Sequence, residues 1–258
     1  MILWREEFNL MDTTIYIGTV TKNHFGTPMK IIAARKKSDI DVQFLDKHGF
    51  IWEHNTYRNF IRGEIINPFD KNIFGVGYFG IGEYKSGTSE HRTPEHYVWR
   101  RMLERCYDKN SKNENPTYYG IVSVCDEWHC FQTFAKWYCE NRYEVEGRLH
   151  IDKDILYPEC KLYSPDTCLL VPQRINMLFV KHRPNRDGLP EGIRRKSNGK
   201  YTAFYQGRLL GTFETIEEAI RFYRIRKKKV IVDVANEYKQ TIPDKLYQAL
   251  LKYEVIVK

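Results

Sequence analysis

Residues 192–219 read GIRRKSNGKYTAFYQGRLLGTFETIEEA, and this stretch decides the fold of the C-terminal part of the chain. Asn198-Gly199 is a strong hairpin signal, and Gln206-Gly207 is a weaker one. Turns at these two places leave three predicted strands, at about 192–196, 200–206 and 208–213.

A helix is predicted directly after the third strand. Thr215 is a good N-cap residue, and Glu218 stands three residues later, where it completes a capping box. We expect the helix to bury Ala219, Ile220, Phe222, Tyr223 and Val230. The stretch therefore predicts a three-stranded antiparallel sheet backed by one helix.

Alternation along the strands assigns two faces to this predicted sheet. The face that packs on the helix holds Tyr201, Ala203 and Tyr205. The outer face holds Thr202, Phe204, Gln206, Arg194 and Lys196. Basic, amide and apolar groups on one surface suit DNA phosphates and base edges, whereas a merely solvated sheet face is the alternative.

The positive charge of the chain is concentrated around this segment. The 258 residues carry a formal net charge of +8 at pH 7. Residues 181–229 hold 14 lysines and arginines against five acidic residues, a net charge of +9. The rest of the chain therefore sums to about −1, and the localised charge favours a polyanionic partner, namely double-stranded DNA.

Four motifs in this order resemble the APETALA-type (ethylene-response-factor-like) DNA-binding domain: Gly192-Ile-Arg, Asn198-Gly-Lys-Tyr-Thr-Ala, Leu210-Gly-Thr-Phe-Glu-Thr and Glu217-Glu-Ala-Ile-Arg-Phe-Tyr. The resemblance implies that the sheet enters the major groove. It implies DNA contacts from Arg194, Arg195, Lys196, Lys200, Phe204, Gln206 and Arg208. Lys196, Asn198 and Phe204 depart from the usual family residues, so the family's sequence preference is not transferred.

Two further domains precede this one, which we place at residues 188–258. Alternating β-forming residues predict strands at 14–20, 29–33 and 40–44 within a β-rich domain at 1–85. A glycine-rich loop at 75–93 leads into a central domain at 92–182. There we predict helices from Thr93 and over 127–138, strands at 149–155 and 168–171, a helix opening at Pro172, and beyond this domain a tail helix at 243–253.

The central domain contains a second group of residues that can carry chemistry. A one-metal nuclease needs a carboxylate and a neutral ligand to hold Mg²⁺ on the scissile phosphate, and a base to activate water. A strand that ends in acids, followed by a loop and a helix with an asparagine, can bring such groups together. The candidates are His150, Asp152, Lys153, Asp154 and Asn176.

These residues belong to motifs at 99–107, 124–128, 151–155 and 163–176 that resemble the HNH (ββα-metal) endonucleases, particularly the phage-type proteins that join such a domain to an APETALA-type module. The resemblance implies a homing-endonuclease-like enzyme that hydrolyses DNA with Mg²⁺ or Mn²⁺. It matches Asp152 and Asn176 to metal ligands, with Asp154 beside them. The expected fold is α+β and multidomain: a small N-terminal β-rich domain, a central ββα-metal-like domain with helices, and a C-terminal three-stranded antiparallel sheet plus helix.

Lys153 stands where this family has its general-base histidine. A protonated lysine cannot accept a proton, although it can stabilise phosphate charge. His150 is an alternative base, two residues before Asp152 on the same strand face. Three readings stay open: an active endonuclease, a catalytically degenerate DNA-binding protein that acts as a phage regulator or anti-defence factor, and a structural role in which Asp152 and Asp154 pair with basic neighbours.

Three other features of the sequence concern membrane contact, the chemistry of the cysteines and the role of the N-terminal domain. No hydrophobic run approaches the roughly 20 residues of a membrane span, so we expect a cytoplasmic protein (in the host cell if phage-encoded) without membrane contact. The six cysteines form no CxxC pair, which favours reduced, mostly buried thiols over a zinc knuckle. The N-terminal domain is expected to serve packing or oligomerisation, or to contact nucleic acid or a host protein.

Overall fold

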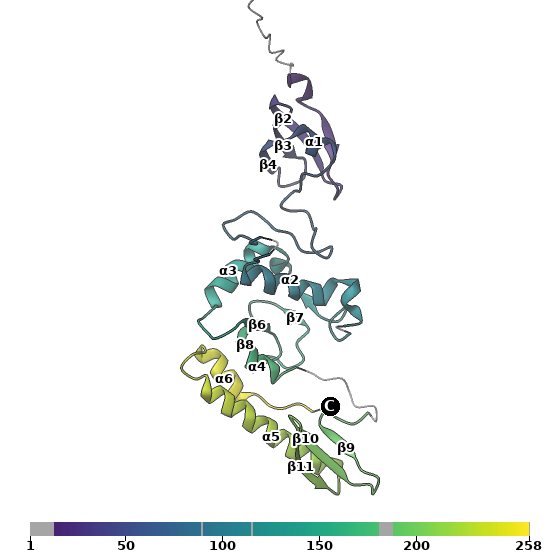
Figure 1. Cartoon of the computed structure of the whole chain (residues 1–258), viewed down its shortest axis with the longest axis vertical. Helices are drawn as coiled ribbons and strands as arrows, with labels where there is room; N and C mark the ends of the chain where they lie inside the picture. The colour runs from purple at the N-terminus through teal and green to yellow at the C-terminus, as the bar shows by residue number, and fades with distance from the viewer. Residues whose placement is uncertain (1–12, 89, 115, 181–187, 258) are drawn as a thin grey trace, which may run out of the picture. The chain divides into compact units, whose positions relative to one another are not determined.

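The computed structural model describes residues 13–88, 90–114, 116–180 and 188–257. It divides into two compact units, one formed by the residues up to Lys85 with Asp126–Phe134, the other by Ser86–Cys125 with the residues from Ala135 onward. The fold is mixed α+β, as the sequence predicts (Figure 1). In the described part of the chain, no helix is long and apolar enough to cross a membrane.

The first unit is built on a four-stranded antiparallel sheet. Its strands follow one another in the order β1 (Val20–Lys22), β2 (Pro28–Lys36), β3 (Asp39–Phe44) and β4 (Ile51–Asn55). The short helix α1 (Tyr57–Ile61) follows, and the core between them contains Met29, Ile31, Ile40, Val42, Phe44, Phe60 and Ile65.

The prediction of a strand at 14–20 is wrong. Residues Thr13–Tyr16 form a 3-10 turn, η1, and β1 begins only at Val20. The backbone N–H groups of Ile17 and Thr19 donate to carbonyls three residues earlier, and Gly18 has a φ of 89°. Local turn bonds therefore occupy the start of the segment, and backbone bonds to β2 begin only at Gly18 and Thr19, which pair with Ile31.

The predicted helix from Thr93 is confirmed as α2 (Pro94–Tyr107), whose first turn Thr93 caps. Two 3-10 turns follow in the chain, η2 (Lys109–Lys112) and η3 (Asp126–His129). The helix predicted at 127–138 is instead α3 (Phe131–Asn141), because η3 occupies the first of those residues and Tyr78 pairs with Cys130 in a β-bridge. The predicted burial of Trp128, Phe131, Phe134, Ala135 and Tyr138 is confirmed.

The second unit contains a strand–strand–helix arrangement. Strand β6 (Leu149–Asp152) pairs antiparallel with β8 (Leu169–Pro172), and α4 (Gln173–Met177) follows β8 directly. Two short strands, β5 (Ser123–Val124) and β7 (Leu162–Tyr163), pair in parallel beside it. The predicted strand at 149–155 thus ends earlier, at Asp152.

The C-terminal part follows its prediction closely. Strands β9 (Ile193–Arg195), β10 (Tyr201–Tyr205) and β11 (Arg208–Phe213) form an antiparallel sheet with β10 in the middle. Helix α5 (Ile216–Glu237) begins with the predicted capping box of Thr215 and Glu218, and α6 (Asp244–Lys252) closes the chain.

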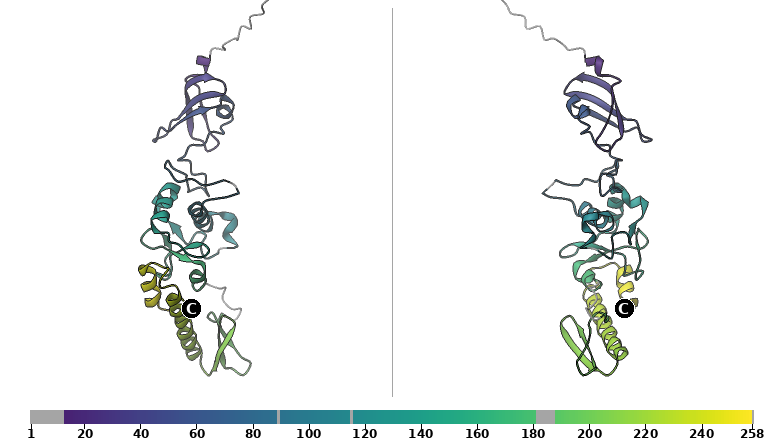
Figure 2. Two further views of the ribbon diagram at one scale, coloured as in Figure 1. Left: turned by 60° about the vertical axis from the view of Figure 1, so that its left-hand side comes forward. Right: turned by 90° about the vertical axis from the view of Figure 1, so that its right-hand side faces the viewer.

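Helix α5 is the long yellow-green helix in Figure 2. Its side chains contribute to two cores. Near its start, Ala219 and Tyr223 pack on the three-stranded sheet. Near its end, Ile231, Val234 and Ala235 share a core with Val171 and Ile175 of the strand–strand–helix arrangement, and with α6. One helix therefore connects the predicted DNA-binding sheet with the predicted nuclease segment.

Candidate nucleic-acid interface and central cleft

The register of the C-terminal sheet settles which residues share its outer face. Arg194 pairs with Thr202, and Thr202 pairs with Thr212 on the other side. A β-bulge between Ala203 and Phe204 then shifts the ladder, so that Phe204 lies opposite Leu209. Leu209 is 58% exposed, and it joins the predicted outer-face residues as an addition that alternation along a single strand could not supply.

Arg194 and Phe204 are in contact on this outer face. The Arg194 guanidinium lies 4.9 Å from the centroid of the Phe204 ring. Arg194 is exposed and Phe204 is half-buried, whereas the neighbouring Thr202 is buried and donates a hydrogen bond from Oγ1 to the Arg194 carbonyl (3.2 Å). The result is an exposed, charged group oriented by an aromatic ring.

The other predicted DNA-contacting residues lie at the edges of this face. Lys196 is exposed and extends the strand, since its N–H donates to the Lys200 carbonyl (2.8 Å). The Lys200 side chain forms an ion pair with Glu214. Arg195 pairs with Tyr201, which packs on the inner core, so the register directs Arg195 to the helix side.

Gln206 and Arg208 belong to the second turn. Gln206 has a φ of 49° and Gly207 a φ of 77°, which are the two positive values of a type I′ hairpin. Gln206 and Arg208 are both exposed there, at the end of the sheet. The structure thus groups Arg194, Lys196 and Phe204 on one surface, leaves Lys200, Gln206 and Arg208 around its rim, and turns Arg195 to the other face.

The inner face explains why the sheet keeps this shape. Ile193, Ala203 and Tyr205 pack against α5, where the Tyr205 and Tyr223 rings meet edge to face at 5.6 Å. The prediction that Phe222 is buried by the same helix is wrong, because that residue is 49% exposed and lies beside the Phe213 ring (4.7 Å). On the opposite face Arg194, Lys196 and Leu209 are exposed, whereas Thr202 is buried.

In the central segment, Asp152 ends β6 and caps the turn that follows. Its Oδ1 accepts hydrogen bonds from the backbone N–H groups of Asp154 (2.9 Å) and Ile155 (2.8 Å). The side chain is only 9% exposed, and burial raises the pKa of the carboxyl to about 6, although the two N–H groups act in the opposite direction. The turn-capping role is the physical reason that the strand is shorter than predicted.

Lys153 and Asp154 form a largely buried ion pair. Lys153 Nζ lies 2.8 Å from Asp154 Oδ2, and Lys153 is 5% exposed. The Lys153 ammonium also lies 5.5 Å from the centroid of the Tyr118 ring and 5.9 Å from that of Tyr163. The Lys153 ammonium is thus engaged by a carboxylate and two aromatic rings at the position where the resemblance to HNH endonucleases implies a general-base histidine.

In each of the two central acids one carboxylate oxygen is already engaged, so only the other oxygen of each could face a metal ion. Mg²⁺ requires carboxylate oxygens that are available in near-octahedral geometry. Asp152 Oδ1 is taken by two backbone N–H groups, and Asp154 Oδ2 is taken by Lys153. The predicted ligand Asn176 lies on the wall of a cleft whose lining, within the described chain, includes neither of these two acids.

That cleft has a volume of about 1230 Å³ and runs along one side of α2, β6 and α4. His150 and Asn176 are the two predicted site residues that it brings together. Burial lowers the pKa of His150, and the positive charges of Arg105 and Arg148 lower it further. His150 is therefore neutral near pH 7 and able to accept a proton or a hydrogen bond.

The walls of the cleft are rich in arginine. Within the described chain its lining contains Arg92, Arg101, Arg105, Arg142 and Arg148. The acidic residues of the lining are Glu90 and Glu144. Sequence reasoning missed this group because its members come from three separate segments, although Arg101 and Arg105 stand four residues apart on one helix face.

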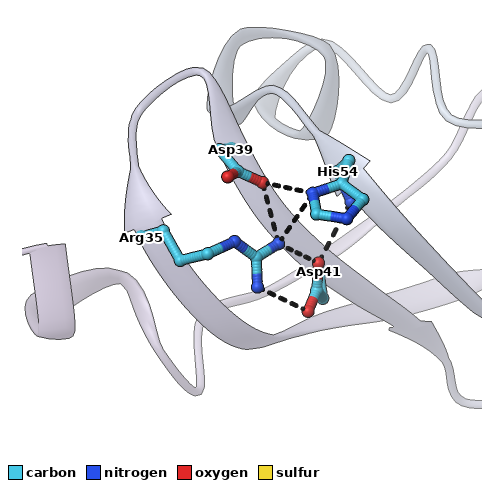
Figure 3. A network of polar contacts seen from close by, with 4 residues as sticks. All are labelled: Arg35, Asp39, Asp41 and His54. Atoms are coloured by element: carbon cyan, nitrogen blue, oxygen red, sulfur yellow. Dashed lines mark hydrogen bonds and ion pairs between the residues drawn. The ribbon is translucent and has the colours of Figure 1, made fainter.

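A cluster of Arg35, Asp39, Asp41 and His54 lies on the sheet of the first unit (Figure 3). His54 Nδ1 lies 2.9 Å from Asp39 Oδ1, and among the described residues the two acids and the histidine are the one His/Cys/Asp/Glu group close enough to share a metal. The Arg35 guanidinium already pairs with both acids and keeps the pKa of each below its usual range. This arrangement ties β2, β3 and β4 together.

Comparisons with known protein families, with curated proteins and with solved structures find no match to this chain.

Proposed function

We propose that this protein binds double-stranded DNA through the outer face of its C-terminal sheet. The observation that carries the proposal is the exposed Arg194 guanidinium, oriented by the Phe204 ring, beside Lys196 on a sheet whose opposite face is packed on α5. A planar guanidinium can bind a guanine edge with two hydrogen bonds, and exposed Leu209 offers apolar contact to a thymine methyl group. The net charge of +9 over residues 181–229 supplies attraction to phosphates.

The proposal is tested by fluorescence anisotropy with labelled duplex DNA at several salt concentrations. The double variant Arg194→Ala/Lys196→Ala is expected to bind at least about tenfold more weakly and to reduce the salt dependence. Lys245→Ala, which removes an exposed lysine from α6, is the matched control and should bind like the parent protein. An unchanged affinity and salt slope in the double variant would reject the sheet as the DNA-binding surface.

The biological role that fits this binding best is that of a DNA-binding phage regulator or anti-defence factor acting in the host cytoplasm. The buried Lys153–Asp154 pair supports it over a nuclease, because the general-base position then holds a cation and a neighbouring acid is occupied. A contact of the N-terminal unit with a host protein is part of the same proposal.

DNA hydrolysis with Mg²⁺ or Mn²⁺ is the second candidate function. Its support is that His150 and Asn176 line one cleft, with His150 in its neutral form. Incubation of plasmid DNA with the protein and either metal tests it, with His150→Ala and Asn176→Ala as variants. Absence of nicking, or nicking that persists unchanged in both variants, would eliminate hydrolysis by this site.

A further inference from the structure

The arginine cleft contains a cation without an ionic partner. Arg105 is half-buried, and its Nε is shielded from solvent without a hydrogen-bond partner. Within the described chain no carboxylate lies within 4.0 Å of its guanidinium, and Asp152 acts on it only through space. A buried charge without a partner is costly, so this position favours an anion.

Aromatic rings hold the Arg105 guanidinium in place. It lies 5.4 Å from the centroid of the Tyr118 ring and 5.7 Å from that of Tyr163, which is almost fully buried. Cation–π contacts of this kind orient a guanidinium without neutralising its charge. Arg105 is thus positioned in advance, with its donors available to a ligand in the cleft.

The chemistry of the lining identifies the anion as a phosphate. The planar guanidinium fork matches the oxygens of a phosphate group, and the other arginines of the wall add positive charge around it. Arg148 lies over the Tyr97 ring (5.5 Å), so the cleft also offers aromatic surface beside its cations, as nucleic-acid-binding grooves do. The same excess of positive charge opposes the entry of a divalent metal ion.

We propose that the cleft binds a DNA backbone phosphate directly through Arg105, without a divalent cation. This inference rests on the proposed DNA-binding function and adds a second contact to it. The phosphate then takes the place of the missing counter-charge of Arg105. Arg142, which is exposed at the mouth of the same cleft, provides an additional contact.

The decisive variant is Arg105→Gln in the full-length chain, with binding of a labelled mixed-sequence duplex measured in EDTA. We expect its affinity to fall about tenfold or more. Without DNA, its thermal unfolding temperature should match or exceed that of the parent, because an unpaired buried charge has been removed. Arg142→Ala should weaken binding in the same direction without touching the core, and Arg58→Ala, an exposed arginine of the first unit, should have no effect.

Each outcome bears on the proposal. Arg105→Gln and Arg142→Ala with parental affinity would overturn it, while weakened binding by Arg194→Ala/Lys196→Ala in the same assay would leave the proposed function standing. A loss that appears only when Mg²⁺ is added would also overturn it, since direct binding needs no metal. Inorganic phosphate is the second probe: if it raises the unfolding temperature of the parent but Arg105→Gln binds DNA normally, the site takes free phosphate and the DNA assignment is wrong.

Discussion

The guanidinium of Arg194 lies over the ring of Phe204, 4.9 Å from its centroid, on the open face of the C-terminal sheet. The contact joins neighbouring strands, since Arg194 belongs to β9 and Phe204 to β10. The ring limits the directions in which the arginine can point. That restriction is what a surface needs if it is to distinguish bases rather than only attract phosphates.

The variant Arg194→Lys separates the discrimination of bases from the attraction of phosphates. Lysine retains the positive charge but loses the planar pair of donors and most of the stacking on Phe204. We expect non-specific duplex binding and its salt slope to be nearly unchanged, and preference for the best site to fall by about 1–3 kcal/mol. Selection of preferred sites from a random duplex pool, followed by affinity measurements on matched and mismatched sites, checks this. Equal discrimination by Arg194→Lys would show that the arginine contacts phosphates only.

Asp152 is expected to make the protein less stable as the pH rises. Its pKa is about 6 in the folded protein against 3.8 for an ordinary aspartate, so folding favours the protonated form. The contribution of this raised pKa to the free energy of unfolding is fully present below about pH 4 and is lost as the pH rises through 6. Its upper bound is about 3 kcal/mol. Urea unfolding at a series of pH values measures it.

Asp152→Asn is the control for this titration. The amide Oδ1 can still accept the two N–H bonds of the turn without a charge, so the variant should match the parent near pH 4 and exceed its stability near pH 8. Asp152→Ala should instead lose about 1–3 kcal/mol near pH 4, because two buried N–H groups lose their acceptor, and clearly less near pH 8, where removal of the buried carboxylate offsets that loss. A stability difference between parent and Asp152→Asn that does not vary with pH would refute the raised pKa.

Lys153 is expected to act on stability rather than on catalysis. Lys153→Met leaves the Asp154 carboxylate without its ammonium partner in a largely buried place, at a cost of about 3–5 kcal/mol. Lys153→Met/Asp154→Leu removes both charges and should recover most of that loss. Chemical denaturation of the two variants measures the coupling. If the double variant were as unstable as the single one, the ion pair would not be the reason for the effect.

Local signals in the sequence predict most of the C-terminal fold and less of the central site. The Thr215–Glu218 capping box and the Asn198-Gly199 turn act within a few residues, and both are found as predicted. The shortened strand at Asp152 depends on where one carboxylate points, which alternation does not encode. Arg105 looks like a solvated helix residue in sequence, and only the positions of Tyr118 and Tyr163 make it a buried cation.

Gly192 is expected to be essential to the shape of the sheet that we propose to bind DNA. It has a φ of 78°, and a Cβ there would collide with the Phe204 carbonyl oxygen and the Tyr223 ring. Gly192→Ala should therefore destabilise the protein by about 2 kcal/mol or more and weaken duplex binding, because the strand that carries Phe204 must shift.

Gly199→Ala is the matched control for this effect. Gly199 has a similar φ of 83°, but a Cβ there meets nothing within 4 Å. Gly199→Ala should therefore lower the free energy of unfolding only by the backbone strain of about 1 kcal/mol. It should leave duplex affinity close to that of the parent. Thermal unfolding and anisotropy titrations on both variants give the comparison. Equal losses at the two positions would mean that the close approach of Gly192 to Phe204 and Tyr223 does not constrain the sheet.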